Sequence, residues 1–234
     1  MKREPTAKSE ATRERIIEAA LQLFAEKGFE AATMREIAER ADCSLGLAYR
    51  YYRSKDAMAL ALYQRLLEEF AASVKEVRSG NLAKRWLAIT RAEFERIAPH
   101  RQALSGLIYA GLRPGSATQV LGEESRPIRM RMIEIFAELV SGSNDLPRSA
   151  DIRSLAVLLY GVHLLLVLFW LQDPTSGQTA CVSLTELIGE AIGWLKIAAR
   201  LPGFGGMLQR LGGILRPILE GEAPAAPAAT GIHQ

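Results

Sequence analysis

The stretch TMREIAERADCSLGLAYRYYRSKDAM, from Thr33 to Met58, predicts a helix, a tight turn, a second helix and the start of a third. Thr33 and Glu36 have the spacing of a capping box, in which the Thr hydroxyl accepts a backbone N–H and the Glu side chain reaches back to the cap. Asp42 tolerates left-handed backbone, and Ser44 is a good N-cap. We therefore expect one helix to end near Asp42 and the next to begin after Ser44.

The second helix of this stretch runs from Leu45 to about Tyr52 and is dense in tyrosine and arginine, with no acidic residue before Asp56. A short helix of this composition, set at a turn after a capped helix, meets the requirements of a reader of the DNA major groove. By spacing alone, an ordinary hairpin of two helices fits as well.

A family resemblance favours the first interpretation. From Thr12 to about Phe70 the chain resembles the DNA-binding domain of the tetracycline-repressor (TetR) family. The matching residues are Arg15-Ile16-Ile17-Glu18-Ala19-Ala20, Leu23-Phe24, Lys27-Gly28-Phe29, Thr33, Arg35-Glu36-Ile37-Ala38, Ala41, Ser44, Gly46, Tyr49, Tyr52 and Ser54-Lys55-Asp56. Asp42 stands where the family usually has Gly, and Cys43 where it has a branched apolar residue. The resemblance covers about a quarter of the chain, and beyond it only the helical layout agrees.

The sequence predicts an all-α fold, because helical periodicity recurs along the chain and no stretch alternates as a strand does. We expect an N-terminal three-helix helix-turn-helix domain and a C-terminal helical domain for ligand binding and dimerisation. The predicted divisions are a flexible arm (1–11), the DNA-binding domain (12–58, motif 33–52), the regulatory domain (59–220) and a disordered tail (221–234). The helix after Ser54 runs to about Arg78 and would link the two domains mechanically, and 201–220 suggests one short extra helix.

Composition and charge are those of a soluble globular protein. The 234 residues are 49% hydrophobic and 24% charged with a net charge of only +3, so affinity for nucleic acid must come from local clustering of basic residues. Two cysteines, Cys43 and Cys181, give no disulfide framework and fit the reducing cytoplasm. Cys43 is either a small apolar filler, which we favour, or a redox sensor. The charged N-terminus does not have the pattern of a signal peptide.

The run from Ser154 to Gln172 is apolar and uncharged, and its length reaches the lower limit for a membrane span. It stands alone in an otherwise amphipathic chain and contains His163. A helix that is apolar all round is also typical of a protein core. We predict a core helix and no membrane partner.

Motifs for catalysis or metal binding are missing from the sequence. It has no H-x-x-x-H, H-E-x-x-H or C-x-x-C arrangement, no G-x-S-x-G elbow and no P-loop. We therefore expect neither an enzyme nor a protein with a cofactor, and the expected small molecule is an unknown effector of apolar or amphipathic character.

A ligand pocket is suggested by large, soft or amphipathic side chains in the C-terminal two thirds, although aromatic residues at helical spacing also simply fill cores. The predicted pocket residues are Trp86, Phe94, Tyr109, Met132, Tyr160 and His163, with Met130, Phe169 and Trp170 as further candidates. His163 either bonds a ligand or is a neutral core histidine bonded to a backbone carbonyl, and we favour the second.

For self-association, Gly189 and Gly193 lie four apart, where missing side chains allow close approach of another helix. The predicted dimer contacts are Leu184, Leu187, Gly189, Ala191, Gly193 and Trp194. The resemblance implies a two-fold dimer in which the last two long helices of each subunit form a four-helix bundle. A two-fold dimer is also required to set two recognition helices about one helical turn of DNA apart.

The resemblance also implies which residues meet DNA. Base edges would be met by Leu45, Gly46, Leu47 and Tyr49, and Arg35 would reach a base or a phosphate; phosphates would be gripped by Thr33, Ser44, Arg50, Tyr51 and Lys55. The predicted function is a regulator, acting as a repressor, that binds a pseudo-palindromic operator in double-stranded DNA as a homodimer and is released by a small molecule. The alternatives are a helical binding or adaptor protein that does not bind DNA, and a membrane-associated helical protein.

Overall fold

The computed structural model describes residues 7–77, 80–113, 115–116, 118–147 and 150–221. Within these ranges the chain is helical, without a β-strand, which confirms the predicted all-α class. The helices are α1 (Ala7–Lys27), α2 (Met34–Arg40), α3 (Leu45–Tyr51), α4 (Lys55–Glu76), α5 (Leu82–Ile97), α6 (Arg101–Gly111), α7 (Arg126–Ser141), α8 (Ile152–Gln172), α9 (Thr179–Ala198) and α10 (Phe204–Glu220). Short 3-10 turns, Ala98–His100 and Ser176–Gln178, precede α6 and α9.

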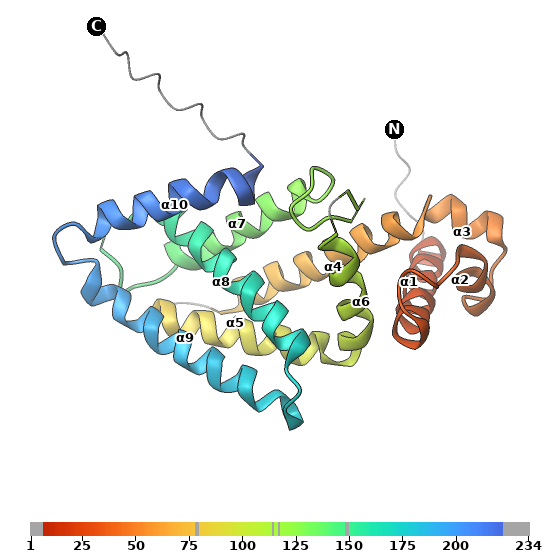
Figure 1. The fold of residues 1–234 in the computed structure, drawn as a ribbon, viewed down its shortest axis with the longest axis horizontal. Coiled ribbons are helices and arrows are strands. Elements are labelled where there is room, and N and C mark those ends of the chain that lie inside the picture. The colour runs from red at the N-terminus through yellow and green to blue at the C-terminus, as the bar shows by residue number, and fades with distance from the viewer. Residues whose placement is uncertain (1–6, 78–79, 114, 117, 148–149, 222–234) are drawn as a thin grey trace, which may run out of the picture.

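Helices α1, α2 and α3 gather at one end of an elongated molecule, and α4 runs from them into a larger body formed by α5 to α10 (Figure 1). The small unit has its own core, in which Ile16, Ile37 and Ala48 are fully buried. The rings of Phe24 and Phe29 meet edge to face with centroids 5.1 Å apart. The packing of α1 on α6 joins this unit to the larger body.

Helix α1 begins at Ala7, earlier than the start at Thr12 that the sequence suggested. Residues 7–11 are therefore helical and not part of an arm, while 1–6 lie outside the described residues. Two contacts account for the longer helix. The Thr12 hydroxyl donates to the Lys8 carbonyl at 2.9 Å, and the Ser9 hydroxyl lies 3.1 Å from the hydroxyl of Tyr51 on α3.

Helix α4 has the length and position expected of a link. Ser54 caps it by accepting the Ala57 N–H at 3.1 Å. Met58 and Leu62, near its start, are buried beside the small unit, and Phe70 is buried in the larger body. A single continuous helix therefore contributes to the cores of both parts.

Helix α8 packs against α6, α7, α9 and α10, as expected of a core helix. By length and composition it is the one helix in the described residues that could cross a membrane, and more than half of its apolar window is buried by the rest of the chain. It also presents three large apolar side chains, Ile152, Leu165 and Phe169, to solvent.

Helix α10 corrects the expectation of a short extra helix at 201–220. It spans seventeen residues and starts after Gly203, whose left-handed backbone redirects the chain. Leu208 and Leu219 are buried, and Gly212 allows close approach to α8, because an added Cβ there would lie 2.5 Å from the Ser154 hydroxyl. The tail predicted to be disordered, apart from Gly221, lies outside the described residues.

Candidate nucleic-acid interface and ligand cavity

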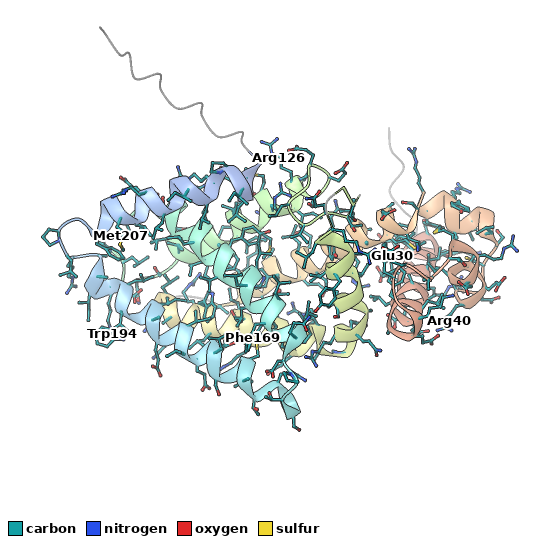
Figure 2. The ribbon with its side chains drawn as sticks, in the orientation of Figure 1. Glu30, Arg40, Arg126, Phe169, Trp194 and Met207 are labelled. Atoms are coloured by element: carbon teal, nitrogen blue, oxygen red, sulfur yellow. The ribbon has the colours of Figure 1, made fainter. Side chains whose placement is uncertain are left out.

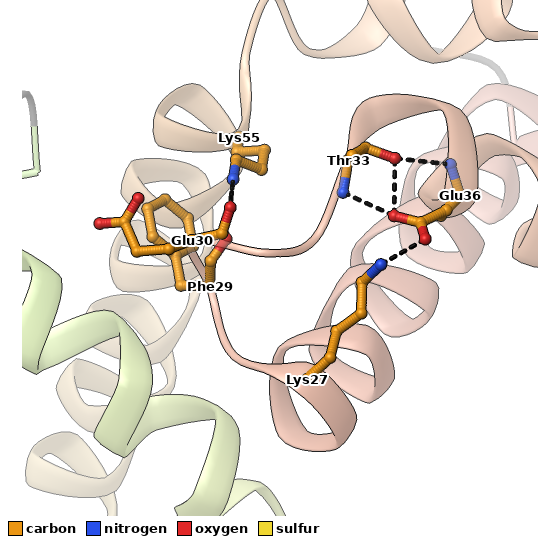
Figure 3. A network of polar contacts seen from close by, with 6 residues as sticks. All are labelled: Lys27, Phe29, Glu30, Thr33, Glu36 and Lys55. Atoms are coloured by element: carbon orange, nitrogen blue, oxygen red, sulfur yellow. Dashed lines mark hydrogen bonds and ion pairs between the residues drawn. The ribbon is translucent and has the colours of Figure 1, made fainter.

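The start of α2 has the predicted capping box. The Thr33 hydroxyl accepts the Glu36 N–H at 3.3 Å, and the Glu36 carboxylate accepts the Thr33 N–H at 3.0 Å (Figure 3). The Lys27 ammonium pairs with the same carboxylate. The hydrogen bonds from Lys27 and Thr33 lower the pKa of Glu36 to about 2, so this carboxylate stays charged and holds the end of α1 against the start of α2.

The turn between α2 and α3 also forms as the sequence predicts. Asp42 has a positive φ of 48°, the left-handed conformation that Asp tolerates better than most residues. Cys43 is half-buried against the core, which is the filler role that we favoured. The Ser44 hydroxyl accepts the Leu47 N–H at 3.2 Å and so starts α3.

Helix α3 presents Gly46, Tyr49 and Arg50 to solvent, whereas Leu45 and Leu47 are half-buried. A shallow hollow between α2, α3 and the start of α4 brings together residues from all three helices. It is lined by Glu30, Ala32, Thr33, Met34, Arg35, Leu45, Tyr49, Arg53, Ser54, Lys55 and Asp56. Five of the ten residues predicted to meet DNA thus share one concave surface.

Charges on this face are unevenly compensated. Arg40 and Lys27 pair with Glu26 and Glu36. No ion pair within the described part of the chain involves Arg35, Arg50 or Arg53, and all three are exposed. Arg53 was not among the predicted site residues, although its place at the end of a Tyr/Arg-rich helix was a sufficient signal. These guanidinium groups bring positive charge to the face, and Glu30 and Asp56 bring negative charge to the same hollow.

Lys55 and Tyr51, which were both predicted to grip phosphates, make intramolecular bonds in the structure. The Lys55 ammonium donates to the carbonyls of Phe29 and Glu30 at 2.8 and 2.9 Å and lies 4.9 Å from the centre of the Phe29 ring (Figure 3). The Tyr51 hydroxyl is bonded to Ser9. Lys55 thus ties the turn after α1 to the start of α4.

A cavity of about 160 Å³ lies in the larger body. Its wall is largely apolar. The lining residues are Tyr63, Leu66, Leu67, Phe70, Glu93, Ile97, Leu104, Ile108, Val120, Ser125, Ile128, Arg129, Met132, Tyr160, His163, Leu164 and Val167. Three of the predicted pocket residues, Met132, Tyr160 and His163, line this cavity.

The other predicted pocket residues do not line this cavity. The side chain of Trp86, on α5, is fully buried in the hydrophobic core. Phe94 stacks on Trp170 with ring centroids 5.3 Å apart, beside a separate hollow next to α9. Tyr109 is 48% exposed. Helical spacing gives the phase of a side chain around its own helix but not which neighbour it meets, and that accounts for the different positions of these three side chains.

Two charged residues on the cavity wall were missed. Glu93 follows Trp86 and Ile89 and precedes Ile97 on one face of α5, so an acid within an apolar stripe was the available signal. Arg129 is buried on α7 and donates to the carbonyls of Val120, Gly122 and Leu219 and to the Ser125 hydroxyl. Burial lowers the pKa of Arg129.

His163 is less tied to the backbone than we predicted. Its Nδ1 has no hydrogen-bond partner and lies 3.6 Å from the Glu93 carboxylate. Burial lowers the pKa of His163 to about 4, so the imidazole is neutral at physiological pH, in agreement with the predicted neutral form.

The predicted dimer residues divide between the two sides of α9. Leu187 and Trp194 are 61% and 66% exposed, Ala191 is exposed, and Leu184 is half-buried. Gly189 is a correction, because it is buried against α5 of its own chain, where an added Cβ would lie 2.7 Å from Leu87. Gly193 faces Ala83 of α5 with more space, at 3.8 Å. Figure 2 labels Phe169, Trp194 and Met207, exposed apolar side chains of α8, α9 and α10.

Comparison with known proteins agrees with this architecture. The family described as bacterial regulatory proteins, tetR family, matches residues 16–62. The transcriptional repressor KstR of Rhodococcus jostii is 37% identical over 73 residues, which are 31% of this chain and 34% of that protein. The chain thus spans only about a third of the length of this relative.

Solved structures match over a larger part of the chain. A tetR-family transcriptional regulator from Streptomyces coelicolor has a TM-score of 0.60 at 23% identity, covering 86% of this chain and 88% of that one. FadR from Bacillus subtilis, solved in complex with stearoyl-CoA, has a TM-score of 0.60 at 17% identity and covers 76% and 96%. At these identities the likeness is one of fold.

The N-terminal helices have the geometry of a helix-turn-helix domain. The match over residues 16–62, from within α1 to within α4, identifies this part as similar to the tetR-family domain, and the remaining helices share the fold of solved tetR-family regulators.

Proposed function

We propose that this protein is a ligand-responsive transcriptional regulator that binds a pseudo-palindromic operator as a homodimer. The observation that carries the proposal is the exposed face of α3, where Gly46, Tyr49 and Arg50 project from a helix fixed at its start by Ser44. A short, rigidly held and exposed second helix is the part of such motifs that enters the major groove.

Base reading in this proposal depends on shape and apolar contact more than on hydrogen bonds. Gly46 allows the helix to approach the groove closely, and Tyr49 is the large exposed side chain of α3. Leu45 and Leu47 keep part of their surface accessible, and leucine can contact thymine methyl groups. Sequence discrimination by this helix should therefore be moderate at each base pair.

Phosphate contacts are assigned to the unpaired basic residues. Arg35, Arg50 and Arg53 surround the hollow or adjoin it, and the Ser44 hydroxyl, which accepts from Leu47, keeps its own hydrogen for donation. Such contacts fix the position of a protein on DNA and make its affinity depend on salt. Lys55 contributes indirectly, by holding the turn before α2.

Dimerisation in this proposal uses the exposed apolar face of α8 and α9. Leu165 and Phe169 on α8 and Leu187 and Trp194 on α9 are each more than 40% exposed. Exposed apolar side chains in such number mark interaction surfaces in soluble proteins. A two-fold dimer through this face would set two α3 helices on successive major grooves.

Ligand response is assigned to the cavity, because two elements connect it to the DNA-binding unit. Helix α4 carries Lys55 at one end and the cavity residues Tyr63 and Phe70 further along. Helix α6 contributes Leu104 and Ile108 to the cavity, and just beyond its end Arg113 pairs with Glu30 at 3.0 Å. A ligand would release DNA if it bound the conformation that cannot bind the operator more tightly than the conformation that can. A ligand with equal affinity for both conformations would leave their equilibrium unchanged. That a structural neighbour was solved with stearoyl-CoA supports a small-molecule role for this body.

The test is an electrophoretic shift assay with the intergenic DNA upstream of the gene, using the wild type and Tyr49→Ala. We expect Tyr49→Ala to abolish the specific shift while the protein stays folded, because the side chain is exposed. Tyr109→Ala is the matched control, since Tyr109 has the same 48% exposure but lies on α6. A Tyr49→Ala protein that still shifts the operator specifically would overturn the assignment of α3, and a wild type that binds no DNA would favour the adaptor alternative.

A further inference from the structure

The cavity contains buried polar atoms that the protein itself leaves without partners. Tyr63 Oη, Glu93 Oε2, Arg129 Nη2 and His163 Nδ1 are buried and make no hydrogen bond, and all four residues line the cavity. A buried polar group without a partner costs about 1–3 kcal/mol. Four such atoms around one space indicate that a ligand completes their hydrogen bonds or charge pairing.

Glu93 is the most informative of these groups. Its side chain is 14% exposed, and that of His163 is 5% exposed, so neither is in contact with bulk water to any large extent. Burial raises the pKa of Glu93 to about 8, and the nearby Arg96 lowers it only in part. The empty cavity therefore holds a protonated Glu93 beside a neutral His163, and the acid can ionise at little cost when a positive charge arrives.

Aromatic rings contribute to the wall of the cavity that Glu93 lines. Phe70, Tyr63 and Tyr160 line the same cavity. The Phe70 ring centroid lies 5.4 Å from that of His163, which places it next to the Glu93–His163 pair. Aromatic faces attract organic cations, most strongly where water is excluded. One acid among several aromatic faces is the composition that such cations require.

Other charged groups near the cavity do not provide the partner that Glu93 lacks. Arg96 on α5 donates to the Ser73 hydroxyl at 2.7 Å. Arg129 on α7 directs its Nε and Nη1 to carbonyls of the 120–125 segment and of the end of α10, which offset part of its charge, while its Nη2 makes no hydrogen bond. An anionic ligand at Arg129 is the competing possibility, and the experiment below includes it.

We propose that the cavity binds an amphipathic organic cation, with its amine or quaternary ammonium group paired with the carboxylate of Glu93 and its apolar body against the walls formed by α4, α6 and α8. The assignment rests on the proposed function in one respect, namely that this cavity is the effector site. The chemical argument, however, concerns binding and does not require DNA.

The test is isothermal titration calorimetry of the full chain with three probes of equal chain length, decyltrimethylammonium, 1-decanol and decanoate, each below its micelle concentration. We expect the cation to bind most tightly. Glu93→Gln should lower the affinity for the cation about tenfold or more, because an ion pair is lost in a dry site. It should change the affinity for 1-decanol by less than about threefold. Glu95→Gln is the matched control, since Glu95 is an exposed acid two residues further along α5.

Proton release gives an independent readout. At pH 7 the wild type should release close to one proton for each cation bound, measured as the dependence of the binding heat on the ionisation enthalpy of the buffer. Glu93→Gln should release none. Thermal unfolding of each variant verifies that it is folded before titration.

Two results would overturn the inference: decanoate binding more tightly than the cation, or equal cation affinity in Glu93→Gln and the wild type. Either would leave the proposed regulator intact if the protein still shifts its operator. Conversely, a protein that binds the cation but does not bind DNA would contradict the proposed function and leave the cation site intact.

Discussion

Replacing Gly189 with alanine should destabilise the protein, although alanine is a better helix former. The added Cβ would lie 2.7, 2.7 and 2.8 Å from Cδ1, Cγ and Cδ2 of Leu87 on α5. Rotation about χ2 of Leu87 moves only the two methyl carbons, so relief of all three clashes requires a change of χ1 at Leu87 or a separation of α9 from α5. Overpacking of this kind costs about 1–3 kcal/mol. The gain from replacing a helical glycine is about 1 kcal/mol.

Gly193→Ala is the matched control on the same helix. The nearest atom to its added Cβ is the Ala83 Cβ at 3.8 Å, an ordinary contact, so only the propensity gain of about 1 kcal/mol remains. Equilibrium denaturation of both variants at equal protein concentration should separate them by about 1–3 kcal/mol, or several degrees in Tm. If Gly189→Ala is as stable as Gly193→Ala, then Gly189 does not pack against Leu87 and our correction of its role is wrong.

Three further changes test other parts of the account. Lys55→Met should lower stability by about 1–3 kcal/mol in chemical denaturation, because two charge-assisted hydrogen bonds to carbonyls are lost, one of them part-buried. A fully stable variant with weakened DNA binding would favour a phosphate role for Lys55. Trp194→Asp should shift the protein from dimer to monomer in analytical ultracentrifugation, since a charge would enter the proposed interface; an unchanged dimer would point to another face. The Tm of Glu93→Gln, measured relative to the Tm of the wild type, should rise as the pH rises from 5 to 8.5. The pKa of Glu93 is about 8 in the folded state and about 4.5 in the unfolded state, so the wild type loses stability over that interval. A Tm difference that does not vary with pH would contradict the buried, protonated acid.

Features set by local sequence could be predicted well. The capping box of Thr33 and Glu36, the left-handed turn at Asp42 and the start of α3 at Ser44 all form as expected. Each of these features depends on residues only a few positions apart in the sequence. The all-α class followed from periodicity for the same reason. Such signals do not depend on how distant helices pack.

Features set by packing between distant segments were harder to predict. The spacing of Gly189 and Gly193 predicted a close approach by a helix of another subunit. Only the structure could show that Gly189 instead packs against Leu87 of its own chain. The start of α1 at Ala7 depends on a contact across to Tyr51. The pairing of Glu93 with His163 joins α5 to α8, and neither residue alone reveals the other.

The central claim is that the α3 face reads a specific DNA sequence, and competition fluorescence anisotropy tests it most directly. Labelled upstream DNA would be titrated with the dimer at several salt concentrations, with the same DNA in shuffled sequence as competitor. We expect the native sequence to be preferred by about 10³-fold or more, with affinity for both sequences falling steeply as salt rises. Tyr49→Ala should bring the two affinities together. Equal affinity of the wild type for native and shuffled DNA would contradict sequence-specific reading by this helix.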